Sequence, residues 1–173
     1  DLSNWTCHGV SYRKTDDPYN AEGKLELWAP DVVRGRDGRY YLYYCYRFLD
    51  AMGVAVSERP EGPFEFYGHV QYPDGVDFGK RDNDGTPFDP AVFVDDDGRV
   101  YLYSGFAPKG RLPIKGNLQH DGCYVMELES DMMTIKSGPS VIIPDVNHAD
   151  GTQFEGHAFY EASSIRKFNG TYY

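Results

Sequence analysis

Apolar and polar residues alternate along this chain or form short apolar blocks, and Gly or Pro interrupts the pattern about every ten residues. An alternation with period 2 predicts half-buried β-strands, whereas the 3.6-residue period of amphipathic helices is nearly absent. The sequence therefore predicts an all-β fold with little helix. Its clearest predicted strands are residues 40–46, 53–57, 64–70, 100–104 and 122–128.

A strand start followed by a glycine turn recurs three times, at intervals of 60 and 72 residues. The copies are residues 28–33 before Gly38, residues 88–94 before Gly98, and residues 160–165 before Gly170. The dipeptides Asp-Gly, Asp-Gly and Asn-Gly at these turns predict two-residue type I′ hairpins, because both central residues of that turn have positive φ. Each hairpin would join the first strand of a repeat to its second strand.

Four antiparallel strands repeated at such intervals predict the blades of a β-propeller with long loops. The predicted organisation is one partial propeller domain over residues 1–173. Residues 1–12 would end one blade, residues 27–70 and 88–143 would form two complete blades, and residues 157–173 would begin a fourth. Propeller blades bury their faces against neighbours, so we expect this chain to be a piece of a larger protein that supplies the missing blades.

One position of the repeat changes its chemistry from copy to copy. Nine residues before each turn glycine lie Ala29, Asp89 and Glu161. Pro90 fixes the backbone directly after Asp89, which favours a rigidly aimed carboxylate, although Asp-Pro also commonly begins a plain turn. Glu161 is flanked by aromatic residues on a segment expected to be buried, which would favour a protonated carboxyl able to act as a general acid. A salt-bridged strand Glu is the alternative.

Three further residues are candidates for substrate contacts. Trp28 and Phe88 each precede one of the aligned positions, so their rings would lie near the same mouth, and Trp28 fits a sugar-stacking platform or a core residue equally well. His157 lies four residues before Glu161 and could bind a substrate hydroxyl or tune the acid, although a lone loop His often does neither.

Composition restricts the partners. The formal net charge of −10 disfavours nucleic acid and anionic membrane surfaces, and no apolar run is long enough to cross a bilayer. The three Cys residues lack a CxxC pair, which disfavours a zinc site or a disulfide framework. The acidic runs 82–85 and 95–98 resemble calcium loops, but Lys80 and Phe93 occupy the first ligand positions. We therefore expect no metal and no cofactor.

The three repeated motifs, Trp28-Ala29-Pro30-Asp31-Val32, Phe88-Asp89-Pro90-Ala91-Val92 and Tyr160-Glu161-Ala162-Ser163-Ser164, resemble those of glycoside hydrolase family 43 in the same order. The resemblance covers essentially the whole chain. It implies a five-bladed propeller and hydrolysis of xylose- or arabinose-containing plant glycans with inversion.

The resemblance also implies roles for single residues. Glu161 matches the general acid, and Asp89 matches the Asp that orients this acid and modulates its pKa. The general base would lie upstream of Asp1, so we expect the chain to be inactive alone. Asp31 lies two places past Ala29 and is not a replacement for the base. The alternative from another class is a propeller that binds carbohydrate without catalysis.

Overall fold

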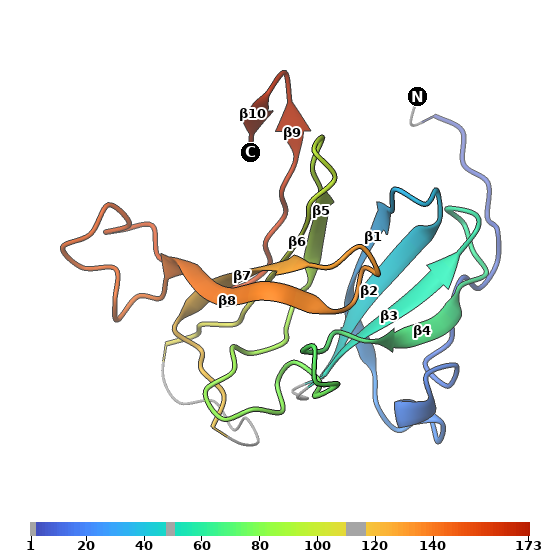
Figure 1. Cartoon of the computed structure of the whole chain (residues 1–173), viewed down its shortest axis with the longest axis horizontal. Coiled ribbons are helices and arrows are strands. Elements are labelled where there is room, and N and C mark those ends of the chain that lie inside the picture. The colour runs from blue at the N-terminus through green and yellow to red at the C-terminus, as the bar shows by residue number, and fades with distance from the viewer. Residues whose placement is uncertain (1–2, 48–50, 110–116) are drawn as a thin grey trace.

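The computed structural model describes residues 3–47, 51–109 and 117–173 (Figure 1). Two four-stranded antiparallel sheets lie side by side, each with its strands in chain order. The strands of the first sheet are β1 (Leu27–Arg34), β2 (Tyr40–Tyr46), β3 (Met52–Ser57) and β4 (Glu65–His69). Those of the second are β5 (Ala91–Val94), β6 (Val100–Ser104), β7 (Gly122–Leu128) and β8 (Ile135–Pro144).

A short hairpin, β9 (Lys167–Phe168) and β10 (Thr171–Tyr172), follows the second sheet. The one helical element among the described residues is the 3₁₀-helix η1 (Pro18–Asn20). No helix in these ranges is long and apolar enough to span a membrane. Residues 3–12 form no strand, and their assignment to the end of a preceding blade stays a prediction.

The turns of the two complete sheets differ from the predicted type I′ geometry. In the second sheet the Asp95 N–H donates to Arg99 O, and the Gly98 N–H donates to Asp95 O, so three residues separate the paired strand ends. Only Gly98, at φ 87°, has a positive φ in this turn. The first sheet has the same arrangement around Gly38. The prediction of two-residue turns was wrong here because one additional residue enters each turn before the glycine.

The third turn is the two-residue hairpin that the sequence predicts. Phe168 pairs with Thr171, and the two residues between them, Asn169 and Gly170, have φ of 49° and 75°. Because this turn is one residue shorter than the other two, a different residue of the third copy corresponds to Asp89.

The main core lies between the two large sheets. Tyr43 and Val54 from the first sheet pack with Val92, Leu102 and Met126 from the second, and all five side chains are buried. Removing this apolar surface from water is the main stabilising contribution to the sheet pair. A smaller cluster covers the other face of the first sheet, where the segment before β1 packs.

A buried carboxylate attaches the segment before β1 to the first sheet. Asp17 is fully buried, and its Oδ2 accepts hydrogen bonds from the hydroxyls of Tyr44, at 2.7 Å, and Tyr46. His69 Nε2 lies 3.2 Å from the same oxygen, and the Tyr19 N–H donates to Oδ1 at 2.8 Å. Both carboxylate oxygens therefore accept hydrogen bonds, as a buried ion requires.

Side chains also connect the turns that follow β1, β5 and β9. Arg36 Nη1, between β1 and β2, donates to Asp97 O, between β5 and β6, at 3.1 Å. Lys167 Nζ from β9 lies 2.6 Å from Asp95 Oδ1 and 2.9 Å from Asp96 Oδ2. These contacts explain the acidic run 95–98 as a structural turn, and Figure 1 shows the three turns at the same end of the molecule.

Candidate active site

Three strand starts line one hollow of about 280 Å³ at the end of the sheets opposite these turns. The lining residues come from 29–31 at β1, 89–91 at β5, and 162–164 before β9. The three segments are the three copies of the repeat, so the fold brings together residues far apart in the sequence.

One backbone conformation recurs at these starts. Ala29, Asp89 and Ala162 have φ of 49°, 50° and 54°, a left-handed region that is costly for residues other than Gly. Each lies six residues before the residue that is paired across its turn, which is Gly35, Asp95 or Phe168. By backbone conformation, the residue of the third copy that corresponds to Asp89 is therefore Ala162.

Counting nine residues back from the turn glycine placed Glu161 at this position, and that alignment is wrong by one residue. The turn at Gly170 is one residue shorter than the turn at Gly98, so the same count reaches one residue too far. Glu161 instead corresponds to Trp28 and Phe88.

The structure nevertheless brings the two predicted carboxyl groups together. Asp89 is half-buried, and this burial, followed by the negative charge of Glu161, raises the pKa of Asp89 to about 6. A backbone hydrogen bond from Ala162 acts in the opposite direction, because a donor stabilises the carboxylate. A proton-binding carboxyl near neutral pH is a feature of acid–base sites.

Glu161 itself is exposed, so the prediction that its segment would be buried was wrong for the described residues. It pairs with Phe106 in an isolated antiparallel bridge, and the Ala107 N–H donates to Tyr160 O at 2.7 Å. The segment after β6 thereby fixes the backbone on which Glu161 stands, while its side chain stays open to solvent.

Aromatic rings connect the start of β1 to the residue before Glu161. Trp28 contacts Phe88 edge to face at 6.0 Å between ring centroids, Phe88 contacts Phe106 at 4.9 Å, and Phe106 contacts Tyr160 at 5.8 Å. Phe88 is buried, whereas Trp28 is half-buried with the Arg47 guanidinium 5.7 Å from its ring centre. Tyr160 is thus the exposed ring of this row, Trp28 and Phe106 are half-buried, and Phe88 is covered.

His157 takes no part in the row of aromatic rings. It is exposed in the loop after β8, where its backbone N–H donates to Phe154 O at 2.8 Å. Its imidazole makes no hydrogen bond within the described parts of the chain, and its contact with substrate stays a prediction.

Asp31 lies at the site, although no role for it could be predicted from the sequence. Its Oδ2 accepts the Val92 N–H at 2.7 Å, from β1 to β5, and it lines the hollow together with Asp89. No local pattern marks Asp31, because its contact is with the neighbouring sheet.

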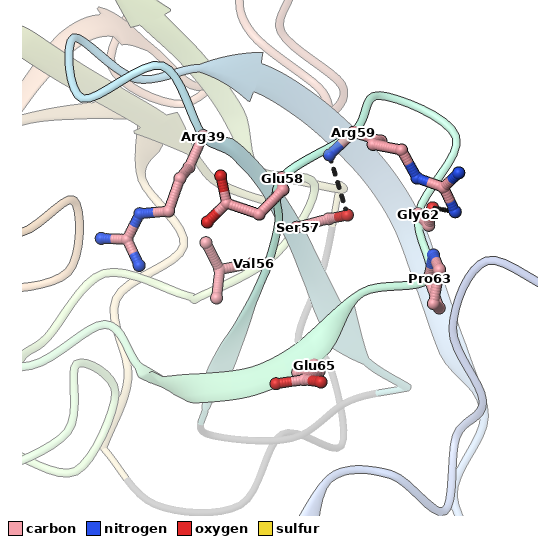
Figure 2. Close-up of a pocket in the computed structure, with 8 residues that line it drawn as sticks. All are labelled: Arg39, Val56, Ser57, Glu58, Arg59, Gly62, Pro63 and Glu65. Carbon is pink, nitrogen blue, oxygen red and sulfur yellow. Dashed lines mark hydrogen bonds between the residues drawn. The ribbon is translucent and has the colours of Figure 1, made fainter.

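A second hollow, of about 300 Å³, lies where β3 ends and β4 begins, away from the strand starts (Figure 2). Its lining includes Arg39, which pairs with Asp37 at 2.7 Å, and Arg59, which donates to Gly62 O at 3.1 Å. Because these guanidinium groups already have partners, the hollow is explained by turn structure. In the described residues no group of three or more His, Cys, Asp or Glu side chains could hold a metal ion.

Comparison with known proteins identifies relatives of the whole chain. The model of glycosyl hydrolases family 43 matches residues 1–173. A xylosidase/arabinosidase of Thermoclostridium stercorarium is 48% identical over 100% of this chain and 35% of its own length.

Solved structures of glycosidases are also similar to this chain. An α-L-arabinofuranosidase from Clostridium thermocellum has a TM-score of 0.64 and 28% identity, covering 99% of this chain and 48% of its own. A GH43_1 enzyme from Xanthomonas citri, solved with xylotriose, has a TM-score of 0.55 and 26% identity over 84% of this chain and 46% of its own. The chain thus spans about a third to a half of these relatives, and the predicted all-β, partial-propeller fold is confirmed.

Proposed function

The chain belongs to glycosyl hydrolases family 43, and we propose that it supplies two catalytic carboxyl groups of an inverting glycosidase. Glu161 is the proposed general acid, and Asp89 is proposed to orient it and modulate its pKa. The observation that carries the proposal is that Asp89, which lines the hollow together with Ala162, accepts a hydrogen bond from the Ala162 backbone and is subject to the negative charge of the adjacent Glu161.

The coupling has a chemical use. Burial and the neighbouring negative charge both disfavour the ionised form of Asp89, so this carboxyl group holds a proton closer to neutral pH than an ordinary Asp does. Glu161 is exposed beside Tyr160, at the end of the aromatic row, where a departing glycosidic oxygen could reach its carboxyl group. Protonation of the leaving oxygen is the task of the acid in both glycosidase mechanisms.

Inversion also needs a general base on the opposite side of the sugar, about 6.5–9.5 Å from the acid, with room for one water. Ala29 occupies the corresponding strand start of β1 and cannot act as a base. We propose that the base comes from the part of the full-length gene product outside this chain, and that the chain alone does not hydrolyse glycosides.

The proposed substrates are xylose- or arabinose-containing plant glycans. The name of the Thermoclostridium stercorarium relative and the xylotriose bound to the Xanthomonas citri enzyme support this class. Trp28 and Tyr160 are proposed to contact the sugar, since an aromatic face suits the apolar side of a pyranose or furanose ring. The sequence also predicts that Phe88 and His157 contact substrate. Phe88 is buried, so we propose for it the support of the Trp28 ring instead, whereas for the exposed His157 we propose contact with substrate.

The test is Glu161→Gln in the full-length gene product, assayed on 4-nitrophenyl glycosides and on unactivated xylo- and arabino-oligosaccharides. Loss of a general acid should lower kcat/KM on the oligosaccharides by about 10²–10⁴. The 4-nitrophenyl substrates should lose less, because their leaving group needs little protonation.

Glu155→Gln is the matched control, since Glu155 is an exposed Glu in the preceding loop. Its kcat/KM should equal that of the wild type on both substrate classes. Unchanged hydrolysis of oligosaccharides by Glu161→Gln would contradict the assignment. A wild-type protein that binds these oligosaccharides without cleaving them would indicate the non-catalytic alternative.

A further inference from the structure

Strand β1 contains an irregularity that sets the direction of Asp31. Trp28 pairs with Cys45 but Asp31 pairs with Tyr43, so three steps on β1 match two on β2. Ala29, with its positive φ, lies within this bulge. A bulge changes the face on which the following side chains point.

After the bulge, Asp31 shares a face with Val33, which packs against the core between the two sheets. This face of β1 lies against β5. Asp31 is half-buried there, and its position leaves the carboxylate opposite the backbone of β5.

Strand β5 is the end strand of its sheet, so one of its edges has no strand partner among the described residues. Its Val92 residue is buried, and a buried N–H on such an edge requires an acceptor. Asp31 Oδ2 provides that acceptor at 2.7 Å. The bond is charge-assisted, which makes it shorter and stronger than a neutral one.

This bond acts close to Asp89. Val92 lies three residues after Asp89, and the intervening Pro90 has no N–H to donate. The Asp31–Val92 bond therefore holds β5 just after the point where Asp89 leaves it with φ 50°.

We propose that Asp31 is a positioning residue for the reaction: its hydrogen bond to Val92 fixes where the Asp89 carboxylate stands relative to Glu161. The inference rests on the proposed function. It assigns Asp31 the task of an acceptor at a fixed distance, and neither a proton transfer nor a contact with substrate.

Two conservative variants of the full-length gene product separate this task from a role of the charge. Asp31→Asn keeps an acceptor oxygen at the same distance and removes the charge. Asp31→Glu keeps the charge and moves the acceptor by one methylene. If Asp31 acts by positioning, the kcat of Asp31→Asn should stay within about threefold of the wild-type value. The kcat of Asp31→Glu should fall by a factor of about 10–10² with little change in KM, because a misplacement near 1 Å has effects of this size.

Arg36→Met is the matched control. It also removes one side-chain-to-backbone hydrogen bond between the same two sheets, but at the far ends of the strands. Its kcat should equal that of the wild type, whatever its melting temperature, since it lies away from Asp89.

The outcomes are distinguishable. A Glu-active, Asn-inactive pattern would overturn the inference in favour of a charge effect, and wild-type kcat in both variants would overturn it outright. So would an equal loss of kcat in Asp31→Glu and Arg36→Met, because that reports general loosening. Full activity of Glu161→Gln on oligosaccharides would remove the proposed function itself, and the inference with it.

Discussion

Asp89 and Glu161 are coupled although 72 residues separate them in the chain: partial burial and, second, the charge of Glu161 raise the pKa of Asp89 to about 6. The ordinary value is 3.8, so the folded protein holds this proton more tightly than the unfolded chain does. By linkage, the contribution of Asp89 to stability is present below about pH 4 and is lost as the pH rises through about 6.

Asp89→Asn should therefore stabilise the full-length gene product at pH 7.5 while removing activity. The variant lacks the partly buried charge but keeps an oxygen for the Ala162 N–H, so we expect its melting temperature to rise by about 2 °C or more. The gain should shrink at pH 4, where wild-type Asp89 is protonated. Thermal unfolding at both pH values measures this, and a lower melting temperature for Asp89→Asn at pH 7.5 would show that the coupling is absent.

The Asp17 cluster should have the opposite dependence on pH. Burial alone would raise the pKa of Asp17, but hydrogen bonds from His69, Tyr44, Tyr46 and the Tyr19 N–H lower it to about 2. A depressed pKa contributes stability that is present above about pH 4 and is lost as the pH falls through about 2.

Asp17→Ala should lower the free energy of unfolding at pH 7 by about 2–4 kcal/mol, because it leaves buried hydroxyls without an acceptor. Urea denaturation measures the change. The neighbouring exposed carboxylate gives the control, and Asp16→Ala should have an effect of less than about 1 kcal/mol. Equal effects of the two variants would mean that burial of Asp17 contributes nothing.

Gly53 allows the Tyr44 ring to reach Asp17. The two residues pair across β2 and β3, and a Cβ on Gly53 would collide with the Tyr44 ring and hydroxyl. Gly53→Ala should displace the ring and lower the free energy of unfolding by about 1–3 kcal/mol. Gly75→Ala is the control: its added Cβ would meet no atom within 4 Å, so this variant reports only the cost of a positive φ. Urea denaturation of both variants tests the collision, and Gly53→Ala as stable as the wild type would exclude it.

The sequence predicted most strands because their side chains alternate or form compact aromatic blocks. The predictions for 40–46, 100–104 and 122–128 match β2, β6 and β7 residue for residue. Strands of this kind form where side chains pack on a pleated, half-buried surface, and the burial of one face fixes their register.

The candidate site was less predictable, since it depends on contacts between repeats. The alignment of Glu161 with Asp89 was wrong because turn length, invisible in the Gly count, differs between Gly98 and Gly170. The role of Asp31 depends on a bulge and on the neighbouring sheet, and no local pattern encodes either. The sequence also predicts that Asp89 and Glu161 converge on one cavity, because repeated strand starts converge in this architecture. The charge of Glu161 does act on Asp89, while the shared cavity stays a prediction.

The final prediction concerns the tie between the C-terminal hairpin and the second sheet. Lys167 Nζ lies 2.6 Å from Asp95 Oδ1, and the Tyr172 hydroxyl donates to Asp95 Oδ2 at 2.5 Å. These two bonds, Lys167 first, lower the pKa of Asp95 to about 2. The tie is therefore present above about pH 4 and is lost as the pH falls through about 2.

Lys167→Met keeps the length of the side chain and removes its charge, so the hairpin should open more often. We expect faster amide hydrogen exchange at Arg166 and Tyr173, whose N–H groups each donate to the other's carbonyl. Lys136→Met is the control, because Lys136 pairs with Glu127 on β7 and β8, away from the hairpin. Since Glu161 lies six residues before Lys167, a hairpin released by Lys167→Met should also lower kcat on oligosaccharides. Unchanged exchange at Arg166 and Tyr173 would mean that the β-hairpin holds its place without the ion pair.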